Sequence, residues 1–305
     1  MSAAPATRGH AVRGAFAAPI LAELDELDRL AQPPLYVDTR SGADYRRGHI
    51  PGAVHLDTFA YANERTDPAG WRKAVADWRA VFAAAGIGAE GTVAFYDGGL
   101  ENRAARNGFM LRYLGHPAAH VLHGGMTAWV QAGRAREREP SLRTPVAVWE
   151  LPPREEMVAL VGEVEAALRP GGPLLLDVRD RGEFDGRVRL QWNPRMGRIP
   201  GAVPLEWTDI LASDQLEQTL VGTPYYASGM RTRLRNDDEV RAALAAAGVT
   251  AGREVIVYCQ KSHRASTVYL ALERLGLRGR VYPGSFREWS RDARLPVDRA
   301  TRGAG

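Results

Sequence analysis

The sequence predicts an α/β protein made of two tandem domains, each with a mostly parallel sheet flanked by helices. The chain has 305 residues, which is about the length of two domains that each bury a core. Short β-branched or aromatic runs alternate with longer segments whose apolar residues recur at helical spacing. This alternation is typical of parallel sheets covered on both faces. The same order of motifs also occurs twice along the chain.

The repeat is visible in three pairs of segments. "LYVDTRSGADYRRGHIPGAVHLD" from Leu35 and "LLLDVRDRGEFDGRVRLQWNPRMGRIPGAVPLE" from Leu174 both lead from an apolar run through Asp-x-Arg to Ile-Pro-Gly-Ala-Val. "TVAFYDGGLENRAARNGFMLRYLG" from Thr92 then matches "EVIVYCQKSHRASTVYLALERLG" from Glu254, and "VLHGGMTAW" matches "VYPGSFREW". Self-similarity in a fixed order indicates an internal duplication.

The boundary between the two copies is predicted from composition. The stretch "REREPSLRTPVAVWELPPRE" is charged, contains prolines and has no clear period, so it is typical of a linker. We place the N-terminal domain at residues 1–140, the linker at 141–153 and the C-terminal domain at 154–305.

Each predicted element follows from a local pattern. Near the N-terminus an apolar stretch runs directly into "ELDEL", which favours the start of a helix over a cleaved signal peptide. The remaining apolar runs predict strands at 35–38, 92–97, 174–178 and 254–258, and the helical spacing predicts helices at 72–86, 238–248 and 264–276.

Composition excludes several classes of protein. No segment approaches the roughly 20 apolar residues of a membrane span, and the net charge of +4 comes from basic residues scattered among nearly as many acids. We therefore expect small anionic ligands and no nucleic-acid or membrane partner. One cysteine allows no internal disulfide, which favours a cytoplasmic protein. No metal-binding or phosphate-binding motif is found, so we expect neither a metal nor a nucleotide cofactor.

The single cysteine, Cys259, lies where a predicted strand ends and a predicted helix begins. Lys261, His263 and Arg264 follow it within five positions. A helix N-terminus and nearby cations both favour the thiolate form near neutral pH. Successive backbone N–H groups of the loop could also form a nest for an anion or for a second sulfur atom.

A less specific interpretation is that Cys259 is a small core residue, as buried cysteines commonly are. The three basic neighbours argue against a dry core, because burying unpaired charges is costly. We therefore interpret Cys259 as a reactive thiol.

The sequence resembles the tandem-domain rhodaneses, which are thiosulfate and 3-mercaptopyruvate sulfurtransferases. "YRRGHIPGAVHL" from Tyr45 and "YPGSFREW" from Tyr282 are similar to the two signatures of that family. The resemblance implies two rhodanese-like domains, with the catalytic cysteine in the C-terminal one. Asp97 stands in the first copy where Cys259 stands in the second, and a carboxylate cannot carry sulfane sulfur. The N-terminal domain is therefore predicted to be inactive.

The resemblance also implies a set of site residues. In the family a six-residue loop holds the persulfide and helps to set substrate preference, and here it comprises Cys259, Gln260, Lys261, Ser262, His263 and Arg264. A lysine in third position resembles thiosulfate-using members, whereas Ser262 stands where many members have glycine. Arg179 matches the arginine that binds the anionic substrate in the family.

Several other residues have plainer interpretations. The counterpart of Arg179 in the first copy, Arg40, has no nucleophile to serve and is expected to form a structural ion pair. His49 and its counterpart Arg198 are expected to be structural hydrogen-bond partners. Trp129 and Trp289 follow glycine-containing turns and are expected in the core.

The leading functional hypothesis is transfer of sulfane sulfur from thiosulfate to cyanide or a thiol through a Cys259 persulfide. A 3-mercaptopyruvate sulfurtransferase is the first alternative. A cysteine-dependent phosphatase or arsenate reductase is a second, although such loops have five residues between cysteine and arginine and this one has four. A third is a non-enzymatic module that delivers sulfur to a partner protein. The expected partners are thus a small anionic donor and a cyanide, thiol or protein acceptor.

Overall fold

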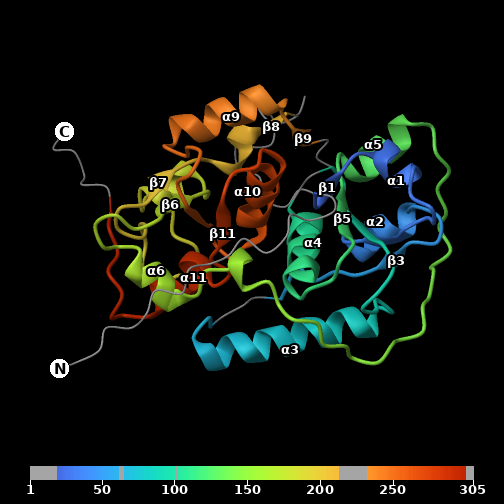
Figure 1. Ribbon diagram of the computed structural model, residues 1–305, viewed down its shortest axis with the longest axis horizontal. Coiled ribbons are helices and arrows are strands. Elements are labelled where there is room, and N and C mark those ends of the chain that lie inside the picture. Colours follow the sequence, from blue (N-terminus) through green and yellow to red (C-terminus); the bar gives the residue numbers. More distant parts are fainter. Residues whose placement is uncertain (1–18, 62–64, 100–101, 213–231, 300–305) are drawn as a thin grey trace.

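The computed structural model describes residues 19–299 except 62–64, 100–101 and 213–231. Within these ranges the chain forms two parallel sheets and a short antiparallel strand pair (Figure 1). The first sheet has the order β1-β5-β4-β2-β3 and the second the order β11-β10-β6-β7. The first comprises β1 (Leu21–Ala22), β2 (Leu35–Asp38), β3 (Val54–His55), β4 (Val93–Tyr96) and β5 (Ala119–Leu122). The second comprises β6 (Leu174–Asp177), β7 (Val203–Pro204), β10 (Val255–Tyr258) and β11 (Gly279–Val281), and β8 (Leu211–Ala212) pairs with β9 (Arg233–Leu234).

Helices cover both sheets. Those of the first half are α1 (Leu24–Asp28), α2 (Gly42–Arg47), α3 (Pro68–Ala84), α4 (Arg103–Tyr113) and α5 (Gly125–Gln131). Those of the second half are α6 (Val161–Ala166), α7 (Arg181–Phe184), α9 (Asp237–Ala246), α10 (His263–Arg274) and α11 (Ser285–Arg291), with short 3₁₀ turns η1 (Glu155–Met157) and η2 (Trp207–Ile210).

The strand order confirms the predicted duplication. The run β5-β4-β2-β3 of the first sheet repeats as β11-β10-β6-β7 in the second, and all of these neighbours are parallel. A parallel bridge between Val158 and Val281 takes the place that the pairing of β1 with β5 has in the first sheet.

Each central strand is buried on both faces. In β10, Val255 and Val257 belong to one apolar cluster, whereas Ile256 and Tyr258 belong to a second one on the opposite face. This alternation follows from the period of two along a strand. It explains why these strands appear in the sequence as continuous apolar runs.

The two domains meet through α4 and α10, which lie side by side in the centre of Figure 1. Phe109 of α4 and Tyr269 of α10 form an edge-to-face pair with ring centroids 4.8 Å apart. One apolar cluster includes residues of both sheets and of both helices. The ten residues of α10 from 263 to 272 are consequently all buried, whereas apolar residues at helical spacing indicate burial of one face only.

The segment 141–153 contains no helix or strand and packs along the end of α3. The indole of Trp149 donates a hydrogen bond to the Ile87 carbonyl at 3.0 Å, and Arg79 donates to the Leu151 carbonyl at 2.9 Å. The connection between the domains is therefore held against the N-terminal domain in the described structure.

The predicted helices are confirmed with shifts of a few residues at their ends. The helices expected at 72–86, 238–248 and 264–276 correspond to α3, α9 and α10, and Gly276 has the left-handed φ of +67° expected at a helix stop. The helix expected from "ELDEL" is α1, while residues 1–18 of the same prediction lie outside the described residues.

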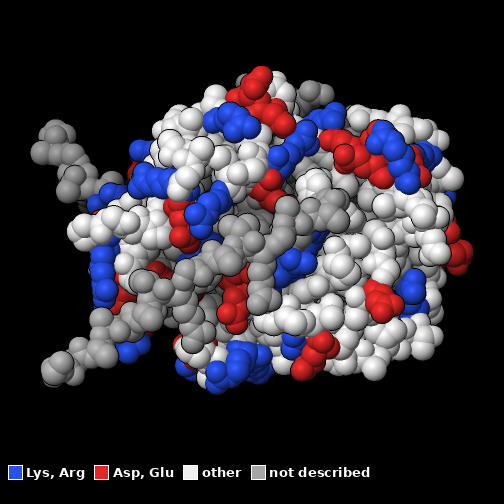
Figure 2. All heavy atoms as spheres, in the orientation of Figure 1, with Lys and Arg blue, Asp and Glu red and all other residues white. Residues whose placement is uncertain are grey.

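On the face shown in Figure 2, basic and acidic side chains are interspersed over the described surface. This agrees with the scattered charge pattern of the sequence. In the part of the chain that the structure describes, no helix is long and apolar enough to cross a membrane.

Candidate active site

Cys259 lies directly after β10 and is 1% exposed. Its carbonyl accepts a hydrogen bond from the Phe286 N–H at 3.0 Å, and the carbonyl of Gln260 accepts one from the Arg287 N–H at 3.3 Å. The first turn of α11 therefore fixes the start of the loop. Because strand end, loop and helix N-termini converge here, the cysteine occupies the position where ligands gather in parallel sheets.

The Ser285 hydroxyl organises the loop from inside. It accepts hydrogen bonds from the N–H groups of Cys259 at 3.3 Å and Ser262 at 3.1 Å, and donates to the Tyr282 carbonyl at 2.9 Å. These two N–H groups are thus bound to a side chain, so they are not part of a nest around the sulfur. Ser285 was not among the predicted site residues, although it lies in the "YPGSFREW" motif.

Two serines of the site have left-handed backbones. Ser262 has a φ of +66° and Ser285 a φ of +54°. Non-glycine residues pay on the order of 1 kcal/mol or more for this conformation. The geometry explains why glycine would suit position 262, and it places local backbone strain next to the cysteine.

His263 is buried and lies among cations. Its ring contacts Phe59 of the N-terminal domain with centroids 5.0 Å apart, and its Nε2 lies 3.4 Å from Nη1 of Arg106. Burial and the charges of Arg106, Lys261 and Arg103 hold the pKa of His263 well below its ordinary value. His263 is therefore neutral near pH 7. It was expected among the cations of the loop, but it adds no positive charge there.

Arg264 is also buried, but its charge is balanced. Its Nη1 lies 2.7 Å from Oε2 of Glu183 and 3.4 Å from Oδ1 of Asp180. The attraction between Arg264 and Glu183 lowers the pKa of that carboxyl, although burial opposes this lowering. The expectation that basic residues exclude burial of the loop is thus wrong for His263 and Arg264: one is neutral and the other is paired.

Arg179 is held by the strand that precedes it. Its Nε donates to Oδ1 of Asp177 at 2.9 Å, and its Nη2 donates to Oδ2 of Asp177 at 2.6 Å and to the Gly197 carbonyl at 2.7 Å. The guanidinium also stacks on Phe286, with its carbon 4.0 Å from the ring centroid. These contacts leave Nη1 as the donor that could meet a substrate anion.

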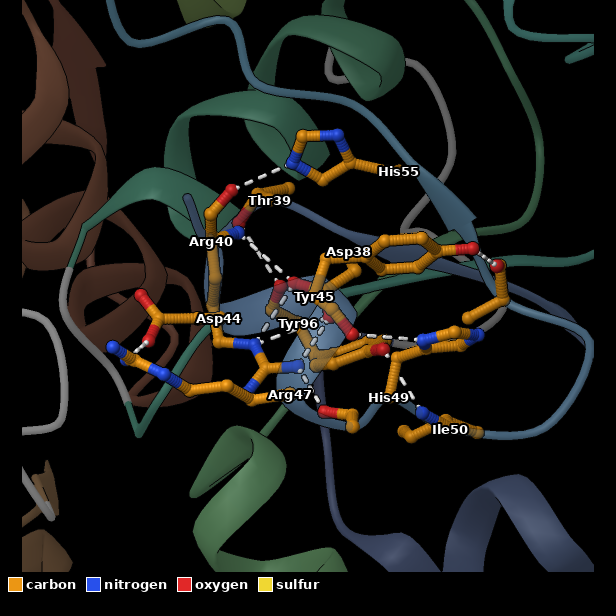
Figure 3. A network of polar contacts seen from close by, with 12 residues as sticks. Asp38, Thr39, Arg40, Asp44, Tyr45, Arg47, His49, Ile50, His55 and Tyr96 are labelled. Atoms are coloured by element: carbon orange, nitrogen blue, oxygen red, sulfur yellow. Dashed lines mark hydrogen bonds and ion pairs between the residues drawn. The ribbon is translucent and has the colours of Figure 1, made fainter. Parts of the chain in front are cut away.

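The N-terminal domain contains the same network without a cysteine (Figure 3). Arg40 donates to Asp38 and to the Gly48 carbonyl, the latter at 2.8 Å, as Arg179 does to Asp177 and Gly197. The predicted structural ion pair of Arg40 is confirmed. His49 is buried next to this network, with Nδ1 2.9 Å from the Tyr45 carbonyl, as a structural role requires.

Other residues that the sequence analysis placed in the core are found there. Trp129 and Trp289 are both buried, and each indole donates to a backbone carbonyl, that of Ala135 and that of Pro296 respectively. Arg198, which was expected to be a structural hydrogen-bond partner, is half-buried; its backbone exchanges hydrogen bonds with Asp298 at 2.8 and 3.0 Å, and its guanidinium lies over the ring of Phe184 at 4.6 Å.

The remaining loop residues contact both domains. The amide of Gln260 exchanges hydrogen bonds with Asn193 at 2.5 and 3.1 Å. The Lys261 ammonium lies 5.4 Å from the ring centroid of Phe59 and 5.5 Å from that of Trp192. The mouth of the site is therefore formed by the N-terminal domain and by the insertion before Ile199.

Asp97 takes the position of the cysteine in the first domain. It is fully buried, and its Oδ2 accepts a hydrogen bond from the Ala104 N–H at 3.1 Å. The helix that follows begins at Arg103, six positions after Asp97, whereas α10 begins only four positions after Cys259. The N-terminal loop thus differs from the catalytic loop in length as well as in chemistry.

Besides Ser285, several contacts of the site were missed by sequence reasoning. Glu183 and Asn193 lie between the Asp-x-Arg and the Ile-Pro-Gly-Ala-Val of the second copy, and the acidic residues of "RDRGEFDG" were the available signal for Glu183 alone. Phe59 and Arg106 come from the N-terminal domain, and no local pattern connects them with the cysteine. Within the described residues, no three His, Cys, Asp or Glu side chains are grouped so as to hold a metal ion.

Comparisons with known proteins agree with this geometry. The rhodanese-like domain family matches residues 23–132 and 160–292. The thiosulfate sulfurtransferase of Pseudomonas aeruginosa is 30% identical, over 92% of this chain and 97% of that protein. The 3-mercaptopyruvate sulfurtransferase of Escherichia coli K12 is 26% identical, over 90% of this chain and 92% of that protein.

Solved structures show the same relationship. A probable thiosulfate sulfurtransferase is 29% identical with a TM-score of 0.65, over 88% of this chain and 99% of that one. The anaerobic ergothioneine biosynthesis enzyme from Chlorobium limicola is 25% identical with a TM-score of 0.71, over 88% of this chain and 64% of that one. Since the family matches both halves, each of which contains the repeated sheet, this chain belongs to the rhodanese family as a tandem-domain member.

Proposed function

We propose that this chain is a thiosulfate sulfurtransferase that moves sulfane sulfur to cyanide or a thiol acceptor through a persulfide on Cys259. The observation that carries the proposal is the placement of Cys259 in a loop between β10 and α10, directly preceding a lysine-containing turn. Three of the curated relatives named thiosulfate sulfurtransferase are 30 to 31% identical, which supports the choice of donor.

The proposed reaction has two displacements. The Cys259 thiolate attacks the outer sulfur of thiosulfate, the S–S bond of the donor breaks, and sulfite leaves with the electron pair. The persulfide anion then loses its outer sulfur to cyanide, which becomes thiocyanate, and the thiolate returns. The proposed reaction starts from the thiolate form of Cys259 and includes no general base.

The proposed substrate contacts follow from the charges. Lys261 at the mouth of the site is the cation that meets the donor, and Gln260, Ser262 and His263 shape the loop. Arg179 and Arg264 are retained in the proposed site. Asp177 balances the charge of Arg179, and Glu183 balances the charge of Arg264. We therefore propose that these two arginines mainly hold the strand end and the loop in place. The N-terminal domain, with Asp97 in place of the cysteine, is proposed to carry no second active centre.

The second candidate is a 3-mercaptopyruvate sulfurtransferase, which the Escherichia coli relative favours. Steady-state kinetics with thiosulfate and mercaptopyruvate, measured on the same preparation, tests the choice. A higher kcat/KM for mercaptopyruvate would overturn the thiosulfate assignment. An assay of phosphate-ester hydrolysis, run without a sulfur donor, tests the phosphatase alternative. Hydrolysis that depends on Cys259 would favour that alternative.

We also propose a class of sulfur acceptor and a cell compartment. The site would serve a small thiol, cyanide or a sulfur-accepting protein. We propose a cytoplasmic location, because a single cysteine that must remain reduced suits a reducing compartment. We also propose that residues 1–140 form the N-terminal domain, that residues 141–153 form the linker, and that residues 154–305 form the C-terminal domain.

A further inference from the structure

An arginine of the N-terminal domain reaches into the catalytic loop of the C-terminal domain. Arg106 lies on α4 and is 0% exposed. Its Nε donates a hydrogen bond to the Ser262 hydroxyl at 3.1 Å, and its Nη1 donates to the Tyr61 carbonyl at 2.6 Å. The Ser262 hydroxyl donates in turn to the Lys261 carbonyl at 2.6 Å. Arg106 is therefore built into the loop that begins at Cys259.

In the described parts of the chain, Arg106 differs from its arginine neighbours in how its charge is balanced. The other arginines around the two loops each contact a carboxylate: Arg40 with Asp38, Arg103 with Asp57, Arg179 with Asp177 and Arg264 with Glu183. Among the described residues no carboxylate lies within ion-pair distance of Arg106, and its Nη2 atom is buried without a hydrogen-bond partner there. A buried cation in this situation requires a compensating anion.

Among the described residues, the negative charge that acts on Arg106 is that of the Cys259 sulfur. Burial lowers the pKa of Arg106 to about 10, and the negative charge of the Cys259 thiolate opposes that lowering. The guanidinium therefore stays charged at neutral pH. Its attraction to the thiolate acts in both directions, because an interaction between two charges stabilises both of them.

We propose that Arg106 is the counter-charge of the anionic sulfur on Cys259, so that the N-terminal domain supplies a positioning residue to the active centre of the C-terminal domain. This inference rests on the proposed function for its chemical steps. In those steps the sulfur on Cys259 is an anion both before transfer, as thiolate, and after transfer, as persulfide. A resident cation that none of the described carboxylates neutralises suits both states.

A purely structural role makes a different prediction. If Arg106 served only to hold Ser262 and to join the domains, its loss would loosen the loop and expose the thiol. A neutral alkylating reagent such as iodoacetamide would then react faster with Cys259. If Arg106 is the counter-charge, its loss makes the thiolate less stable and the reaction slower. Since Cys259 is the only cysteine, alkylation reports on this site alone.

The experiment compares four variants of the full chain with wild type at neutral pH. Arg106→Met removes the charge and the hydrogen bonds, Arg106→Gln keeps an amide donor for Ser262, and Arg106→Lys keeps the charge. Arg112→Met is the control, because Arg112 is an equally buried arginine of the same helix whose charged neighbours are Glu273 and Arg154. Circular dichroism selects the variants that fold.

Iodoacetamide should alkylate both neutral variants of Arg106 about tenfold more slowly than wild type, the size expected when one cation beside a thiolate is lost. Arg106→Lys should stay within about threefold of wild type, as should Arg112→Met. Equal or faster alkylation in the neutral variants, or equal slowing in Arg106→Lys, would overturn the proposal. Because the measurement uses no sulfur donor, it gives an answer even if thiosulfate proves not to be the substrate.

Discussion

Arg264 and Glu183 form a buried ion pair, with Nη1 of the arginine 2.7 Å from Oε2 of the glutamate and both side chains almost fully excluded from solvent. Arg264 belongs to the catalytic loop and Glu183 to α7, after the neighbouring strand β6. The pair therefore ties the loop to the second strand of the site. A buried pair of this kind adds little net stability, but the loss of one partner leaves the other charge uncompensated.

Glu183→Met should lower the free energy of unfolding by about 3–5 kcal/mol, because Arg264 then remains buried without its main counter-charge. The double variant with Arg264→Met should recover most of that loss. Urea denaturation of both single variants and the double variant measures the coupling. Asp180→Asn is the control and should cost about 1 kcal/mol or less, since this carboxyl is partly exposed and burial raises its pKa to about 7. Additive effects in the Glu183 and Arg264 variants would contradict the assignment.

Cys259→Ser should abolish sulfur transfer while the fold is kept, because a serine hydroxyl is not ionised by the same surroundings. Thiocyanate formation from thiosulfate and cyanide should fall by at least about a hundredfold. The Cys259 side chain is small and buried, so the melting temperature should change little. Appreciable turnover in the purified variant would remove Cys259 from the mechanism.

The parts of the fold that local sequence patterns encode were predicted well. Val255 to Tyr258 form a continuous apolar run because both faces of β10 are covered, and Gly276 ends α10 because only a left-handed residue fits there. The burial of the first turns of α10 on every side was not predicted. It arises from α4, which is about 160 residues earlier in the chain, and a helical period contains no information about a partner of that kind.

The candidate site was likewise predicted where one segment of sequence encodes it, and it was missed where it depends on contacts between distant segments. Cys259 and its loop follow from one segment, and so does the pairing of Arg40, since Asp38 is two residues away. The neutral state of His263 and the presence of Arg106 depend on contacts between domains. Residue types alone therefore suggested a loop with three cations, whereas the folded loop has one paired arginine, one neutral histidine and one lysine at its mouth.

Asp97→Ala should change the turnover number by less than about twofold, because this loop carries no transfer chemistry in the proposed function. It should nevertheless reduce stability by about 1–2 kcal/mol, since Asp97 accepts a hydrogen bond from the Ala104 N–H at the start of α4. Asp97→Asn keeps an acceptor oxygen and should lose less. Kinetics and thermal unfolding of the two variants are the measurements. A hundredfold loss of turnover in folded Asp97→Ala would show that the first domain takes part in the chemistry.

Acid should weaken a contact network between the domains that is centred on Glu23. His123 donates to its carboxylate through Nδ1 at 2.6 Å and accepts from the Leu234 N–H at 3.0 Å, and Arg274 lies 3.3 Å from the same carboxylate. The hydrogen bond from His123, together with the hydrogen bond and the charge of Arg274, lowers the pKa of Glu23 to about 2.

Because this folded-state pKa lies below the ordinary value of 4.5, the stabilisation is present above about pH 4.5 and is lost as the pH falls toward 2. Glu23→Gln should remove this contribution and flatten the melting temperature between pH 5 and about pH 3 relative to wild type. Asp25→Asn, an exposed neighbour in the same helix, serves as the control. Identical pH profiles for Glu23→Gln and wild type would contradict the assignment.

Removal of the Lys261 cation should penalise thiosulfate more than mercaptopyruvate, because thiosulfate brings two negative charges into the loop and mercaptopyruvate one. Arg264 is paired with Glu183 and His263 is neutral, so neither can fully replace Lys261. A charge-assisted contact is worth about 1.5–3 kcal/mol, so Lys261→Ala should lower kcat/KM for thiosulfate by about ten- to a hundredfold.

The ratio of kcat/KM for the two donors decides the outcome, and it must be measured for wild type and variant at the same pH and salt. Lys261→Arg is the matched control, since it keeps the charge between the rings of Phe59 and Trp192 and should restore most of the thiosulfate preference. Equal loss with both donors in Lys261→Ala would mean that the lysine shapes the loop without selecting the donor. The thiosulfate assignment would then lose its charge-based support, while sulfur transfer through Cys259 would remain to be judged by the Cys259→Ser variant.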